Sequence, residues 1–119
     1  MEFLVDYYGF RPEEISTGYI HTSRQPKTIP FFRLYSVKLD NHLYTTSTKE
    51  RDLAIKRQGY TLEGTLGYIY TSEGPGRLPL HRLHHPGRND HYYTTSSEER
   101  EEASRNGWGD QGVAGYVLS

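Results

Sequence analysis

Two short polar clusters carry residue types that could recognise a ligand. In each cluster a pair of Asx residues precedes a histidine, and a tyrosine follows two positions later: Asp40, His42 and Tyr44 in the first, and Asp90, His91 and Tyr93 in the second. Carboxylate, imidazole and phenol groups together donate and accept hydrogen bonds, as the hydroxyls of a sugar require. The alternative is a structural turn, in which the Asx side chains bond to the backbone and the histidine pairs with a carboxylate.

An aromatic residue directly follows a glycine at three corresponding places, Phe10, Tyr60 and Trp108. An exposed ring beside polar groups suits a sugar, because the ring covers C–H groups while the polar side chains hold the hydroxyls. The alternative is that these rings fill the core, one in each unit. The carbohydrate hypothesis predicts a ligand site at Asp90, His91, Tyr93 and Trp108, and a weaker one at Asp40, His42, Tyr44 and Tyr60.

Both clusters belong to near copies of one sequence unit. Residues 30–47 and 79–96 align without a gap at an offset of 49 residues, and eight of the eighteen positions are identical. A period of this length indicates one supersecondary unit used repeatedly, with each copy burying its apolar face against its neighbours. Arg33 and Arg82 are among the identical positions. We predict that each is structural and bonds to an acidic or carbonyl partner in its own unit.

A third, partial copy occurs near the N-terminus. Gly9-Phe10 and Gly18-Tyr19-Ile20 match the back half of the unit, whereas the front half has no match. We therefore predict a single domain, residues 1–119, made of a partial unit (1–29) and two full units (30–78 and 79–119). The apolar segment Phe3–Phe10 is predicted either to fill the place of the absent hairpin or to pack against a second copy, giving a homodimer.

Each full unit is expected to contain two short strands, a helix and, after a polar loop, a last strand. In the first unit these elements are predicted at Phe31–Tyr35, His42–Thr46, 48–58 and Gly67–Ile69. In the second they are predicted at Leu80–His84, His91–Thr95, 97–106 and Gly115–Val117. Ser47 and Glu50 form a capping box, as do Ser96 and Glu99, in which the serine accepts from the backbone and the glutamate reaches back to the cap. Gly59 and Gly107 are predicted to end the helices in the left-handed conformation.

Other chemistry finds less support in the sequence. There are no cysteines, so disulfides, thiol catalysis and Cys-ligated zinc are excluded. His81 corresponds to Phe32, which indicates a packing position, and we expect no metal and no other cofactor. Glu63, placed in the polar loop, corresponds to Gln111, and no nucleophile or phosphate-loop motif is present. We therefore expect a protein that is not an enzyme.

The composition indicates which classes of binding partner are to be expected. The net charge is −1 with both signs mixed, which argues against a nucleic-acid footprint. No apolar run approaches the roughly 18 residues of a membrane-spanning helix, so we expect no membrane insertion. The N-terminus lacks the basic start and apolar stretch of a signal peptide. The compartment is accordingly predicted to be either the cytoplasm or, for a mature domain, the outside of the cell.

The units resemble a family of tandem repeats of unassigned function, with units of the form LYRLYN…DHFYTTS…ER…GY…EG…GYV. The matching residues of the first unit are Arg33-Leu34-Tyr35, Asp40 to Ser47, Glu50-Arg51, Gly59-Tyr60, Glu63-Gly64 and Gly67-Tyr68-Ile69. Members occur in bacterial and fungal proteins, often secreted and often beside glycoside-hydrolase, lysozyme or peptidase domains. The resemblance implies a mainly β, β-trefoil-like pseudo-threefold fold with short helices, here with its first repeat truncated.

Residue chemistry and resemblance together favour a non-catalytic, lectin-like module that binds a glycan or a cell-wall polysaccharide. The alternative is a protein-binding module such as a peptidase inhibitor. It would act through one variable loop, Thr71–Leu78, rather than through a site in each unit.

Overall fold

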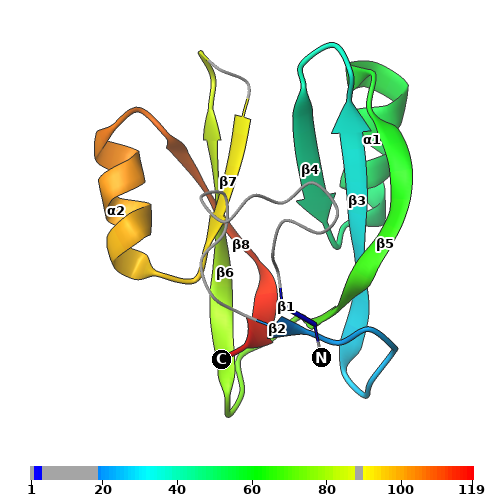
Figure 1. Ribbon diagram of the computed structural model, residues 1–119, viewed down its shortest axis with the longest axis vertical. Helices are drawn as coiled ribbons and strands as arrows, with labels where there is room; N and C mark the ends of the chain where they lie inside the picture. Colours follow the sequence, from blue (N-terminus) through cyan, green and yellow to red (C-terminus); the bar gives the residue numbers. More distant parts are fainter. Residues whose placement is uncertain (1, 4–18, 88–89) are drawn as a thin grey trace.

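Two copies of a ββαβ unit stand side by side in the computed structural model, which describes residues 2–3, 19–87 and 90–119 (Figure 1). The protein is mainly β, with two short helices and a curled antiparallel sheet. The elements are β1 (Glu2–Phe3), β2 (Tyr19–Ile20), β3 (Thr28–Ser36), β4 (Asn41–Thr45), α1 (Thr48–Gln58), β5 (Thr61–Tyr70), β6 (Arg77–His85), β7 (Asp90–Thr94), α2 (Ser97–Arg105) and β8 (Gly109–Leu118). The predicted match at Gly9-Phe10 and most of the segment Phe3–Phe10 lie outside the described residues.

The two units share their strand pairing as well as their element order. β3 pairs with β4 and β5, and β6 pairs in the same way with β7 and β8. The register of the long pair shifts after Phe31 in the first unit and after Leu80, its equivalent, in the second. The bulges are therefore part of the repeat, as expected when they are features of the fold rather than accidents.

The helices begin as the sequence predicts, with one difference. The Ser47 hydroxyl accepts a hydrogen bond from the backbone N–H of Glu50 at 3.0 Å, and Ser96 accepts from Glu99 at 3.1 Å. The two glutamate carboxylates, however, do not complete the capping box. That of Glu50 binds Arg82, and that of Glu99 accepts from Thr94. The backbone N–H groups of Ser47 and Ser96 donate instead to the hydroxyls of Thr45 and Thr94, both at 3.0 Å.

Both glycines predicted to follow the helices in the left-handed conformation, Gly59 and Gly107, are confirmed. Gly59 has φ 75° and Gly107 has φ 94°, values that a residue with a side chain adopts only with strain. α1 ends directly at Gly59. α2 is shorter and ends at Asn106, one residue before Gly107, and the N–H of Trp108 donates back to the carbonyl of Ala103. The chain is thereby turned sharply into the following strand in both units.

The prediction of a polar loop before the last strand of each unit is wrong. β5 begins at Thr61 and β8 at Gly109, directly after the helix ends. The backbone of these segments pairs with β3 and β6, while most of their side chains up to Leu66 and Ala114 face solvent. A strand with one solvated face takes polar side chains, and therefore it resembled a loop in sequence. Glu63 consequently lies on a strand.

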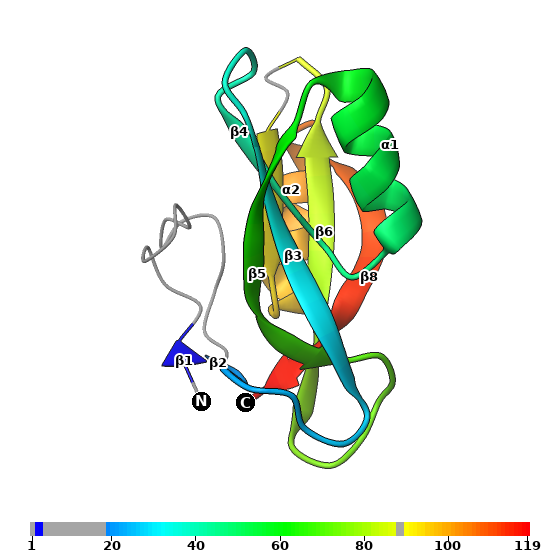
Figure 2. The same ribbon diagram turned by 90° about the vertical axis from the view of Figure 1, so that its right-hand side faces the viewer.

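The last strands of the units meet at the base of the molecule. Tyr70 of β5 pairs with Tyr116 of β8, and Tyr19 of β2 pairs with Leu118 of β8. A bridge between His21 and Tyr68 links the segment after β2 to β5. Figure 2 shows β2 at this base, beside the C-terminal end of β8.

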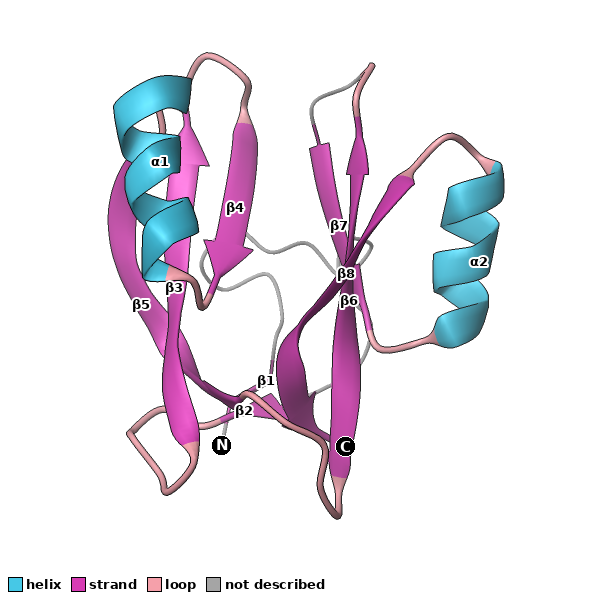
Figure 3. Ribbon diagram, turned by 180° about the vertical axis from the view of Figure 1, so that it is seen from behind, coloured by secondary structure: helices cyan, strands magenta, loops and turns pink. Residues whose placement is uncertain are grey.

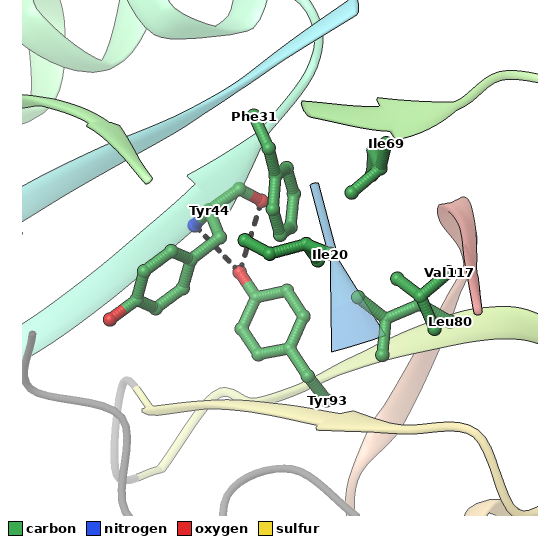
Figure 4. Packing of buried hydrophobic residues seen from close by; sticks show 7 residues of the cluster. All are labelled: Ile20, Phe31, Tyr44, Ile69, Leu80, Tyr93 and Val117. Carbon is green, nitrogen blue, oxygen red and sulfur yellow. Dashed lines mark hydrogen bonds between the residues drawn. The ribbon is translucent and has the colours of Figure 1, made fainter. Parts of the chain in front are cut away.

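The central core draws on equivalent positions of the units. Its buried members are Ile20, Ile69 and Val117, with the equivalent pairs Phe31 and Leu80, and Tyr44 and Tyr93 (Figure 4). The Tyr93 hydroxyl accepts from the backbone N–H of Tyr44 at 2.8 Å and donates to its carbonyl at 3.2 Å. Burial raises the pKa of Tyr93, so its hydroxyl stays protonated. One phenol thus ties the second unit to the backbone of the first.

A second buried cluster lies in the first unit alone and consists of Leu34, Leu43, Ala54 and Tyr60. Ala54 belongs to α1, which Figure 3 shows against the sheet of its own unit. The equivalent α2 has no fully buried residue. Within the described residues, no helix is long and apolar enough to cross a bilayer.

Gly67→Ala is expected to destabilise the domain by about 1–3 kcal/mol, the usual cost of overpacking. A Cβ there would lie 2.4 Å from Cδ1 of Ile20 and 2.7 Å from the carbonyl oxygen of His21. The latter is backbone and cannot rotate away. Chemical denaturation measures the effect, with Gly109→Ala as the control, since its nearest obstacle is the carbonyl oxygen of His84 at 3.5 Å. Equal losses in the two variants would contradict the packing argument.

Candidate functional site

A cleft of about 460 Å³ lies where the two units meet, and we call it the junction cleft. It is built from both units because β4 of the first packs beside β7 of the second. The first unit contributes Leu43, Glu50, Gln58 and Tyr60, and the second contributes Arg82, His91 and Gln111.

An ion pair between a largely buried arginine and a half-buried glutamate forms one wall of the junction cleft. Arg82 donates to both carboxylate oxygens of Glu50, at 2.8 and 2.7 Å, and its Nε donates to the Gln111 side-chain carbonyl at 2.8 Å. The Arg82 side chain is 14% exposed. Burial opposes both charges, but the hydrogen bonds between them outweigh it, raising the pKa of Arg82 and, with a bond from Thr45, lowering that of Glu50. Both groups are therefore ionised near neutral pH and cancel each other's charge.

Asn41 organises the neighbouring wall. Its Nδ2 donates to the Tyr60 hydroxyl and to Nδ1 of His91, both at 2.8 Å, and its Oδ1 accepts from the backbone N–H of His91 at 3.2 Å. Because Nδ1 of His91 accepts, the ring is neutral. Burial and the nearby positive charge of Arg82 lower the pKa of His91 to about 3.

The junction cleft as a whole carries little net charge. Burial also lowers the pKa of His84, and the Arg82–Glu50 pair is neutral overall. Exposed Lys38, which forms no ion pair with the residues that the structure describes, therefore supplies the main remaining charge of the lining. The side-chain amides of Gln58 and Gln111 offer donors and acceptors. Such a lining is suited to hydrogen bonding with a neutral, polar ligand. Nowhere in the described residues do three or more His, Cys, Asp or Glu side chains gather to hold a metal ion.

A family model described as Domain of unknown function (DUF5648) matches residues 1–118 of the chain. The chain belongs to the DUF5648 family. No curated protein and no solved structure matched it. The resemblance to a family of unassigned function is thus confirmed, whereas the secreted setting and the hydrolase neighbours remain predictions.

Two predicted ligand residues of the DUF5648 chain lie in its core. Tyr44 is fully buried and Tyr93 is 1% exposed. Their rings pack in the central cluster, so neither can contact a ligand on the surface. The sequence pattern misled because tyrosine suits a core strand as well as a binding site when its hydroxyl has a partner.

Two others, Tyr60 and His91, line the junction cleft of the DUF5648 chain, but they come from different units. The prediction had grouped each with residues of its own unit. His42 lies 3.5 Å from Glu63, which also pairs with Arg33 at 3.0 Å, all within the first unit. Glu63 therefore has a structural role there.

The remaining predicted residues occupy turns and the outer side of the second unit. Asp40 has φ 48° and accepts a hydrogen bond from the Tyr35 hydroxyl at 2.6 Å, a side-chain partner rather than the backbone partner of the structural-turn alternative. Asp90 begins β7. Trp108 is half-buried, with its ring 5.7 Å from that of Tyr92 and 5.2 Å from that of His85. The structure thus does not bring Trp108 into the junction cleft.

Sequence reasoning missed how the DUF5648 units interlock. Arg82 bonds to Gln111 in its own unit, as predicted, but its acidic partner Glu50 belongs to the other unit. Gln58 was not singled out, and Asn41 was considered only as part of the Asx pair that precedes His42. The sequence did contain a signal for the Arg82–Glu50 pair, because both residue types recur at equivalent positions of the two units. The repeat alone, however, does not say whether the arginine and the glutamate meet within a unit or between units.

Proposed function

We propose that this DUF5648 domain is a non-catalytic, lectin-like module that binds a neutral sugar in the junction cleft. The observation that carries the proposal is a cleft of about 460 Å³ in which Arg82 and Glu50 neutralise each other and the other polar groups, apart from Lys38, are amides, imidazoles and a phenol. This volume falls within the range of small-ligand pockets.

The chemistry of the lining favours hydroxyl groups over charged ligands. Gln58 and Gln111 each offer an amide, Lys38 offers an ammonium group at the rim, and Leu39 and Leu43 offer apolar surface for C–H groups. The Glu50 carboxylate keeps acceptor capacity beyond the bonds from Arg82 and Thr45. The walls are held by hydrogen bonds between units, so little ordering is needed when a ligand binds.

We also propose that the domain is a pseudo-threefold, β-trefoil-like arrangement with a truncated first repeat. Mutual pairing of the ends of β2, β5 and β8 supports this proposal. The proposal is also supported by the central core, in which three side chains, one from each repeat, pack together: Ile20, Ile69 and Val117.

Gln58→Ala is expected to weaken sugar binding at least tenfold while leaving the fold intact. Gln58 lines the cleft, is exposed, and makes no hydrogen bond through its side chain within the described residues, so its amide is available for a ligand. A glycan array would select the sugar, and isothermal titration would give affinities, which we expect to be micromolar to millimolar.

The matched control for this experiment is Gln25→Ala. Gln25 is a glutamine outside the cleft whose hydrogen bonds, among the described parts of the chain, go to Ser23 and Thr28. Absence of any glycan hit, or equal weakening by both variants, would count against the carbohydrate proposal.

The loop Thr71–Leu78 favours a second candidate, a protein-binding module such as a peptidase inhibitor. The Arg77 guanidinium lies 3.7 Å from the ring centroid of Tyr70 and donates to the carbonyls of Ser72 and Glu73. These contacts hold an exposed loop in one shape, which is favourable for docking into a partner's cleft. Inhibition across a panel of peptidases, lost in Arg77→Ala, would support this candidate over the first.

A further inference from the structure

The second unit repeats the site in which the first unit holds Arg82. In the first unit the Glu50 carboxylate receives the Arg82 guanidinium and a hydrogen bond from Thr45, with Tyr60 nearby in the same cleft. Their equivalents in the second unit are Glu99, Thr94 and Trp108.

The local geometry of the repeated site is preserved. Thr94 Oγ1 donates to Glu99 at 2.5 Å, as Thr45 does to Glu50, and the Tyr92 hydroxyl donates to the same carboxylate at 3.3 Å. The Tyr92 ring then contacts Trp108. A carboxylate held in place beside two aromatic rings is thus presented on the outer side of the second unit.

The two sites differ in what fills them. Glu50 is half-buried beneath Arg82, whereas Glu99 is exposed and forms no ion pair with any arginine or lysine of the described ranges 19–87 and 90–119. Tyr60 is 5% exposed, whereas Trp108 is only half-buried.

We propose that Glu99, Tyr92 and Trp108 form a docking site for an arginine carried on a strand of a separate partner polypeptide. The occupant follows from the internal precedent, since the same carboxylate–threonine pair already binds a strand-borne arginine within this chain. A planar guanidinium matches a carboxylate bidentately and also stacks on aromatic rings. An ammonium group or a neutral sugar would satisfy only part of this surface.

The test uses the full chain and a cyclised peptide with the sequence of residues 77–95, which carries Arg82. Trp108 is the only tryptophan, so its fluorescence reports on the site directly. We expect a saturable change on titration, weakened at least tenfold by Glu99→Gln and by replacing Arg82 of the peptide with neutral citrulline, while its other two arginines are kept. Glu98→Gln removes the same charge one residue away and should leave the affinity unchanged. Circular dichroism confirms that both variants are folded.

Three results would overturn the proposal. They are no saturable change, equal weakening by the Glu98 and Glu99 variants, and self-association of the chain that Glu99→Gln abolishes. The last would show that the occupant is a second copy rather than a separate partner. Because Glu99 lies outside the junction cleft, Glu99→Gln should leave glycan binding intact, so this test fails or succeeds independently of the carbohydrate proposal.

Discussion

Arg82→Ala is expected to lower the free energy of unfolding by about 1–3 kcal/mol, the usual cost of leaving a hydrogen-bonded polar group without its partner. The variant strands the Glu50 carboxylate, which otherwise receives two hydrogen bonds from the guanidinium, and removes the bond to Gln111. It also removes one of the links between the two units along the junction cleft. Urea denaturation followed by circular dichroism measures the change.

Two further variants test the reason for this loss. Arg100→Ala removes an arginine that lies 4.0 Å from Asp110 at the surface and should cost less than about 1 kcal/mol. The double variant Arg82→Met with Glu50→Leu should be less damaging than Arg82→Ala, because no half-buried charge is left without its partner. If Arg82→Ala unfolds at the same urea concentration as the wild type, the ion pair does not hold the units together.

Acidification from pH 7 to pH 5 is expected to remove about 2 kcal/mol of stability through His91 alone. The pKa of His91 is lowered to about 3 in the folded chain by burial and by Arg82, against 6.5 for the free side chain. A lowered histidine pKa means that the unfolded chain takes up the proton first, so stability is present above pH 6.5 and falls as the pH drops towards 3. Below about pH 4.5 Glu50 adds a loss in the same direction, since its pKa is also lowered.

His91→Gln isolates this contribution. The Gln carbonyl is able to accept from Asn41 but does not titrate, so the variant should lose about 2 kcal/mol less than the wild type between pH 7 and pH 5. His85→Gln, at a histidine that packs on Trp108 away from the junction, is the control. Thermal melts at each pH provide the measurement. Parallel pH profiles for the wild type and His91→Gln would disprove the role of His91.

Local signals allowed much of each unit to be predicted from sequence. The serine caps, the glycines after the helices and the alternating strand residues act over a few positions, and α1 and α2 lie where they were expected. The full length of β5 was not predictable, because a solvated strand face has the composition of a loop.

The candidate site was harder to predict, because it depends on contacts between units. Asn41 and His91 lie 50 positions apart in the chain, and Arg82 lies 32 positions from Glu50. A repeat shows which positions are equivalent but not which copies touch. The repeat likewise does not tell that Tyr60 is buried against Leu34, Leu43 and Ala54 whereas its equivalent Trp108 is only half-buried.

The phenol of Tyr93 that bonds to the backbone of Tyr44 has a consequence for how the chain folds. This bond, like those of Asn41, closes a loop of roughly a unit's length, so its entropic cost must be met before it contributes. Contacts within a hairpin close much shorter loops and form sooner. Each unit should therefore acquire its hairpin first, and the two should lock only when the tyrosine reaches the neighbouring strand. Until then both units expose the strand edges through which they later meet. During synthesis, the first unit cannot form these contacts before the second unit has been made.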